Sequence, residues 1–196
     1  MDLREAEIGD RISHEKCRPP IIEVGNAARA AIIAPALAGA PGQSLRSEGL
    51  KPWAERDPRV VFVGADTGSV ELKENRRIAY CVWGYENPNV AHCKITRNAQ
   101  MPRLPKEVRG KELSEKSQLG FQYVLSVDGN GASWGRIPWV LKGGSVLLKD
   151  HVPDAEKLWY YPFMRAQEHF VPVTLETIAQ ERDRLYGNIE ECSRLI

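Results

Sequence analysis

The chain has 196 residues, of which 42% are hydrophobic, enough for one ordinary globular core but short for two full domains. Lys and Arg total 27 against 26 Asp and Glu, so no overall positive field attracts nucleic acid or a membrane surface, and we expect any anion site to be local. The cysteines form no C-x-x-C pair and no metal-ligand spacing with a histidine, which predicts buried, reduced thiols and leaves a disulfide open: Cys17, Cys81, Cys93 and Cys192.

Residues 1–58 are predicted to be an N-terminal segment and linker, a remnant of an acceptor domain at most, before a domain at 59–196. The Ala-rich stretch 27–40 is interrupted by Arg29 and Pro35 and is shorter than the roughly 20 residues that a membrane span needs. The acidic start of the chain lacks the basic region of a secretion signal. We therefore expect no membrane span and no signal peptide.

From residue 59 the sequence changes to short apolar runs that are typical of parallel strands covered on both faces. These runs are 59–64, 91–96, 121–127, 145–149 and 169–173. Helices are predicted between them at 70–86, 133–142 and 153–164, the second accepting Pro138 only in its opening turns. The strand–helix alternation predicts an α/β Rossmann-like domain with a parallel sheet.

The last segment predicts a single closing helix. Apolar residues recur there at three- and four-residue steps from Leu175 to Ile196, which gives one mostly apolar stripe. Thr174 is placed to cap the N-terminus of this helix.

The glycine-rich stretch "VDGNGASWGR" at 127–136 is a candidate anion site, because ligands of open α/β sheets gather where strands end and helices begin. Gly129 and Gly131 allow close backbone approach, Ser133 can cap the helix or donate to a phosphate oxygen, and Arg136 supplies a fork of donors. An ordinary glycine turn with a solvated arginine explains the same residues equally well.

A dinucleotide site, and with it a nicotinamide-dependent oxidoreductase, is the minor alternative. Asp150 ends the next predicted strand, where a ribose-binding acid belongs. The glycines, however, follow G-x-G-x-x-x-G, and Trp134 and Arg136 would crowd the position where a small residue lets helix and strand pack closely.

The order of several motifs resembles a known family. The stretch 121–149, "FQYVLSVDGNGASWGRIPWVLKGGSVLLK", followed by "EHFVPV", is similar to the nucleotide-binding half of the protein O-glucosyltransferase and capsule-associated xylosyltransferase family, glycosyltransferase family 90. Upstream, "PWAERDPRVVFVGADTGS" and "NRRIAYCVWGYENPNVAHCKIT" resemble two further segments of that family. The resemblance runs from about Trp53 to the C-terminus.

The resemblance implies an inverting GT-B glycosyltransferase whose C-terminal Rossmann-like half holds a UDP-sugar, such as UDP-xylose or UDP-glucose. It implies a protein or glycan acceptor, no metal, and no cofactor beyond the donor substrate. Arg136 and Arg77 match the arginines that contact the donor diphosphate, and Ser133 with the backbone of Asn130, Gly131 and Ala132 lines the same pocket. A nucleoside diphosphate leaving group without a metal needs such cationic and N–H donors.

Gly64 and Thr67 match the family loop after the first strand, but the sequence also departs from the family there. Val63 replaces an arginine, and Asp66 stands where a basic residue can occur, which weakens the case for anion binding by this loop. The family works in the secretory lumen, whereas this chain shows no entry signal, so the compartment stays open.

The catalytic residue is unassigned. The family's base is an aspartate in the N-terminal half, which needs more residues than precede Gly64, and Asp10 and His14 match no motif. A non-catalytic nucleotide-binding module is therefore the alternative to the enzyme.

The other candidate residues have structural interpretations that we favour. Asp128 is expected to satisfy turn amides more than to bind the donor, and Lys149 and Asp150 are expected to be solvated at a strand end. His92 and His151 have no local partner set for a metal, and His169, beside Phe170, is expected to be a packed or surface imidazole and not a catalytic one. The aromatic rings are expected mostly to fill the layers beside the sheet: Trp134, Trp139, Trp159, Tyr160 and Tyr161.

Overall fold

A computed structural model describes residues 49–101, 103–133, 135–152, 160–186 and 188–196. One five-stranded sheet forms its centre, in the order β2-β1-β3-β4-β5, and every neighbouring pair is parallel. The strands are β1 (Asp57–Ala65), β2 (Ala91–Arg97), β3 (Phe121–Ser126), β4 (Val146–Asp150) and β5 (Val171–Val173). This is the predicted α/β Rossmann-like arrangement, with each predicted strand found to within two residues of its expected start and end.

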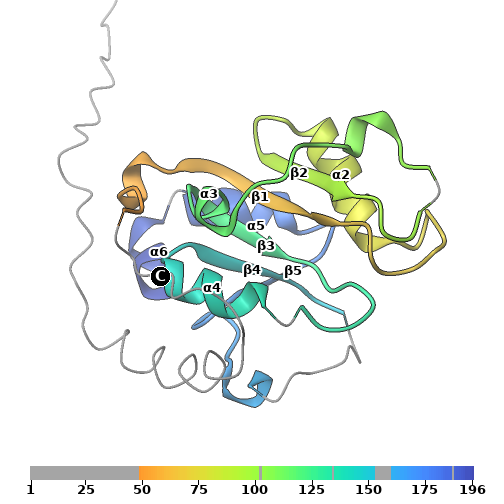
Figure 1. The fold of residues 1–196 in the computed structure, drawn as a ribbon. Coiled ribbons are helices and arrows are strands. Elements are labelled where there is room, and N and C mark those ends of the chain that lie inside the picture. Colours follow the sequence, from red (N-terminus) through yellow and green to blue (C-terminus); the bar gives the residue numbers. More distant parts are fainter. Residues whose placement is uncertain (1–48, 102, 134, 153–159, 187) are drawn as a thin grey trace, which may run out of the picture.

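Helices cover both faces of the sheet (Figure 1). Val60 and Phe62 of β1 face one core, to which α2 (Arg76–Glu86), α5 (Ile178–Tyr186) and α6 (Ile189–Leu195) contribute. Val61 and Val63 face a second core formed with α4 (Arg136–Gly143) and Leu119, the residue after α3 (Glu115–Gln118). Successive strand residues thus bury opposite faces, as the apolar runs predicted.

Two helices begin later in the chain than predicted, because loop contacts use the residues before them. Asn75 caps α2 by accepting from the N–H of Ile78 at 3.1 Å, and its amide donates to the carbonyls of Asp66 and Ser69, which holds the preceding segment as a turn. The helix predicted from 133 begins at Arg136. Pro138 is the third residue of α4, inside the first turn, as the sequence required.

The prediction of one closing helix is wrong, since two helices occupy that segment. Asn188 starts α6 by accepting from the N–H of Glu191 at 3.1 Å, which is an N-cap. The stripe is buried at Ile178, Leu185 and Cys192 but exposed at Ile189, where the chain restarts as a helix.

Thr174 was expected to cap the N-terminus of the closing helix. The contact at this residue differs, since its backbone N–H donates to the Thr177 hydroxyl at 2.9 Å. The helix predicted at 153–164 is represented by the 3-10 turn η4 (Tyr161–Phe163), and 153–159 lies outside the described residues.

The residues just before β1 pack onto the sheet domain. Trp53, at the start of the 3-10 turn η2 (Trp53–Glu55), meets the Tyr123 ring edge-on at 5.9 Å. Arg56 is buried and donates to the Gly144 carbonyl at 2.7 Å and the Ser145 hydroxyl at 3.0 Å. Within the described residues, no helix is long and apolar enough to cross a membrane.

The strand order places a switch point between β1 and β3. The chain leaves β1 toward β2 on one side and returns through the 3-10 turn η3 (Lys106–Val108) and α3 to β3 on the other. In open parallel sheets the crevice beyond the carboxyl ends of two such strands is where ligands bind. The glycine-rich stretch directly follows β3, so the fold brings it to this crevice.

Candidate functional site

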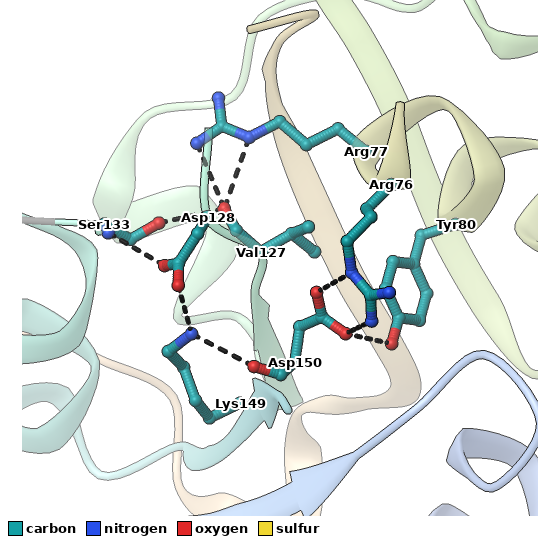
Figure 2. A network of polar contacts seen from close by, with 8 residues as sticks. All are labelled: Arg76, Arg77, Tyr80, Val127, Asp128, Ser133, Lys149 and Asp150. Carbon is teal, nitrogen blue, oxygen red and sulfur yellow. Dashed lines mark hydrogen bonds and ion pairs between the residues drawn. The ribbon is translucent and has the colours of Figure 1, made fainter. Parts of the chain in front are cut away.

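Arg77 of α2 bridges the ends of the two strands at the switch point. Its Nη1 donates to the Thr67 hydroxyl at 2.5 Å and to the Ala65 carbonyl at 3.2 Å, both just beyond or at the end of β1. Its Nε and Nη2 donate to the Val127 carbonyl beyond β3 at 3.2 and 3.0 Å (Figure 2). The guanidinium is therefore held in one orientation at the crevice.

Arg136 reaches the same place from the first turn of α4. Its Nη2 donates to the Val63 carbonyl at 2.8 Å and its Nη1 to the Gln118 amide oxygen at 2.8 Å. The Arg136 and Arg77 guanidiniums lie 5.0 and 5.7 Å from the centroid of one ring, that of Phe62. The structure thus brings the two predicted arginines together.

Within the described residues, no carboxylate forms an ion pair with either arginine of this pair. Burial, and then the positive charge of Arg77, lowers the pKa of Arg136 to about 10, and burial lowers the pKa of Arg77. Two like charges in this arrangement favour the binding of an anion.

The glycine-rich stretch forms the wall of a depression of about 320 Å³ beside the two arginines. Every predicted site residue except Gly64 and Asp128 lines it, together with Gly135: Thr67, Arg77, Gly129, Asn130, Gly131, Ala132, Ser133 and Arg136. We call this hollow the arginine depression. Gly64 lies behind Arg136, in an adjoining groove that Gln118 also lines.

Gly129 is required by close packing against the arginine. A Cβ at this position would lie 2.4 Å from the Thr67 hydroxyl oxygen and 3.0 Å from Nη2 of Arg77. The absence of a side chain at 129 therefore lets Arg77 reach the Val127 carbonyl.

Internal hydrogen bonds fix the loop. The Ser133 hydroxyl donates to the Val127 carbonyl at 2.9 Å, and the Ser133 N–H donates to Oδ1 of Asp128 at 2.9 Å (Figure 2). The Asn130 side chain accepts from the Gly68 N–H at 2.9 Å, which joins this loop to the one after β1. Asp128 thus satisfies a turn amide, as expected.

The expectation that Lys149 and Asp150 are solvated is wrong, because both are buried. Lys149 Nζ donates to Oδ2 of Asp128 at 2.8 Å. Asp150 accepts from Arg76 with both oxygens and from the Tyr80 hydroxyl at 2.7 Å (Figure 2). Both oxygens of this carboxylate already accept hydrogen bonds and its side chain is fully buried, which weakens the support for the dinucleotide alternative.

The Asp66 carboxylate accepts hydrogen bonds from backbone N–H groups. It is fully buried, and its oxygens accept from the N–H groups of Ala99, Gln100 and Met101 at 2.5, 3.1 and 2.8 Å. Burial acts to raise the pKa of Asp66, but these hydrogen bonds together hold it below its ordinary value. Three backbone N–H dipoles therefore offset the negative charge of Asp66, which from the sequence alone counted against anion binding by this loop.

Sequence reasoning missed Gln118, which is buried and orients Arg136 through their 2.8 Å hydrogen bond. A glutamine 18 positions before the arginine gives no sequence signal of this contact.

The remaining candidates are the cysteines, the aromatic rings and the possible metal ligands. Cys81, Cys93 and Cys192 are buried and free, and Trp139 and Tyr160 are buried beside the sheet, as expected. Among the described residues, no cluster of three His, Cys, Asp or Glu side chains could hold a metal ion. Predictions for other residues lie outside the described part of the chain: Asp10, His14, Cys17, Trp134 and Trp159.

No protein-family model matches this chain, and a search of curated proteins finds no match.

Proposed function

We propose that the arginine depression binds the diphosphate of a UDP-sugar, and that this domain is the donor-binding part of an inverting glycosyltransferase. The sugar is xylose or glucose, and the acceptor is a hydroxyl of a protein or glycan. The convergence of Arg77 and Arg136 at the switch point, unpaired with any described carboxylate, carries the proposal. The identity of the nucleotide and the type of reaction are inferred from the motif resemblance.

The arrangement supplies what departure of a nucleoside diphosphate requires. Negative charge develops on the leaving diphosphate as the sugar is transferred, and fixed cationic donors stabilise that charge. The N-cap of α4 is Gly135, which has no side chain to cap the first N–H groups of the helix. Those groups and Arg136 therefore present donors and a favourable helix dipole at the same depression.

Calorimetric titration with UDP tests the binding step. Arg136→Ala removes a charge-assisted, forked donor and is expected to weaken UDP binding at least about tenfold. Arg59→Ala is the matched control, because Arg59 lies near the opposite, amino end of β1, paired with Asp57. Unchanged affinity in the Arg136 variant would refute the proposed site.

Assays of UDP-xylose and UDP-glucose hydrolysis separate an enzyme from a binding module. Turnover that Arg136→Ala reduces supports the glycosyltransferase. UDP binding without any turnover supports the non-catalytic module instead. NAD at millimolar concentration is expected to leave the thermal stability unchanged, and a clear rise would favour the dinucleotide alternative.

A further inference from the structure

A strongly basic surface lies at the β2 edge of the sheet, outside the arginine depression. The stretch 94–111 holds one carboxylate, Glu107, and six cationic side chains, which we call the basic strip: Lys94, Arg97, Arg103, Lys106, Arg109 and Lys111. All of these except the half-buried Lys94 are exposed. Because the whole chain has a formal charge of only +1, the residues outside this stretch are net negative. The positive charge is therefore concentrated at this edge.

Contacts with β2 bring the later part of the strip beside the earlier part. The chain returns along β2 after η3, where the Gly110 N–H donates to the Ile95 carbonyl at 3.0 Å. Lys94 Nζ donates to the Glu107 carbonyl at 2.7 Å. A Cβ at Gly110 would lie 2.6 Å from the Cβ of Lys94, so the absence of a side chain at 110 allows this approach. The six cations thus lie on β2 and on the segment that returns beside it, at the edge where Figure 1 shows β2 next to α2.

The basic strip has no negative partner within the described part of the chain. None of its six cations forms an ion pair with a described carboxylate. At other surfaces Arg59, Arg182 and Arg184 are each paired with a carboxylate. Lys94 and Arg109 donate to backbone carbonyls, which orient the side chains without neutralising their charge. Because neighbouring cations repel one another, this surface favours an anionic partner.

Two observations distinguish between kinds of anionic partner. Residues 93–120 contain no aromatic side chain, whereas surfaces that bind single-stranded nucleic acid use aromatic rings on which bases stack. None of the exposed large hydrophobic residues that the structure describes lies between 93 and 120, whereas binding to a membrane surface also buries apolar side chains. The strip therefore lacks the features that favour a nucleic acid or a membrane.

The backbone after η3 favours an extended peptide. Lys111 and Glu112 follow the bridge between Ile95 and Arg109, and both are exposed and outside any helix or turn. Their N–H groups donate to no group that the structure describes. Open N–H groups at the edge of a sheet can pair with the carbonyls of an added peptide strand.

We propose that the basic strip binds an acidic peptide segment of a partner protein. The Asp and Glu side chains of the partner contact the cations, and its backbone carbonyls accept from the open N–H groups after η3. Because the charges are exposed to solvent, their attraction speeds association and weakens as salt screens it. This surface is separate from the proposed nucleotide site and does not depend on it.

Fluorescence anisotropy tests the proposal with the full chain and a short labelled peptide that carries one Glu for each cation of the strip. This peptide is expected to bind at least about tenfold more tightly than the same peptide with Gln in place of Glu. Binding should weaken at least about tenfold when the salt concentration rises from about 50 to about 300 mM.

Charge reversal within the strip locates the binding surface. Arg103→Glu combined with Lys106→Glu reverses two exposed charges and is expected to weaken the Glu peptide at least about tenfold. Lys51→Glu combined with Arg194→Glu changes the net charge equally, at exposed positions before η2 and in α6, and is the matched control.

Several results would overturn the proposal. These are equal binding of the Glu and Gln peptides, binding that salt leaves unchanged, or equal weakening by the control pair and the strip pair. Tighter binding of an oligouridine of the same charge, or of vesicles that contain phosphatidylserine, would replace the peptide with a nucleic acid or a membrane surface. If the first strip pair lowers Tm, Arg97→Glu combined with Lys111→Glu repeats the measurement, and full affinity in that variant would also refute the site.

Discussion

Replacing Gly129 with alanine places a methyl group where Arg77 and Thr67 now approach the backbone. The new Cβ would lie 2.4 Å from the Thr67 hydroxyl oxygen, whereas ordinary contact begins at 3.4 Å. Thr67 must therefore move by about 1 Å, which disturbs the 2.5 Å hydrogen bond that it accepts from Arg77. Overpacking of this kind costs about 1–3 kcal/mol, so we expect Tm to fall by roughly 2–12 °C.

Thermal and urea unfolding measure this effect, and the loop contains its own control. A Cβ at Gly135 would meet nothing within 4 Å, and its φ of −85° and ψ of −30° suit alanine. Gly135→Ala is therefore expected to be neutral or stabilising by up to about 1 kcal/mol.

A double-mutant cycle tests whether Thr67 is the obstacle to a side chain at 129. Adding Thr67→Ala to Gly129→Ala removes the nearest atom and is expected to recover part of the stability, with a coupling of at least about 0.5 kcal/mol. Steric crowding at 129 is excluded if Gly129→Ala is as stable as the wild type, and Thr67 is not the obstacle if Thr67→Ala changes the free energy of unfolding equally in both backgrounds.

Two further predictions concern side chains whose contacts sequence patterns did not show. Asp66→Asn replaces a charged acceptor of three backbone N–H groups. Urea unfolding at pH 7 is expected to show that this variant has a free energy of unfolding about 1.5–3 kcal/mol below that of the wild type. Because the folded-state pKa of Asp66 lies below its ordinary value of 3.8, its stabilisation is complete above that value and is lost as the pH falls through the folded-state pKa. The difference in free energy of unfolding between the wild type and this variant should therefore be smaller at pH 3 than at pH 7. An equal difference at both pH values would contradict this account. Gln118→Leu removes the acceptor that orients Arg136 and is expected to weaken pyrophosphate binding about two- to tenfold. Gln118→Glu should weaken it further, because a carboxylate there competes with the anion, and calorimetry showing full affinity in both variants would exclude the orienting role.

The strands were predictable because each depends on a local apolar run, as at 59–64, and the five parallel strands follow those runs closely. The helix starts were not, because capping and loop contacts that the apolar pattern does not show set them. Asn75 caps α2 while it also holds the loop after β1. The closing helix is interrupted because Asn188 provides a new N-cap within a continuous apolar stripe.

The site residues that match a family motif could be predicted from the sequence. The burial of charged side chains could not, because it depends on tertiary packing. Motif resemblance selected Arg77 and Arg136, whose contacts with Val127 and Val63 span 50 and 73 positions. Composition gave no indication that Lys149 would be buried beside Asp128, because a charge at a strand end is ordinarily solvated.

The close approach of Arg77 to Gly129 has an evolutionary consequence. No residue larger than glycine fits at 129 while the arginine keeps its bonds to the Val127 carbonyl and Thr67 keeps its rotamer. Substitution at any one of these three positions changes which residues the other two can accept, so homologous sequences should vary there in concert. A homologue with a side chain at 129 is expected to have lost the arginine as well, and such a loss would mark lineages in which this edge of the sheet lacks the paired guanidiniums.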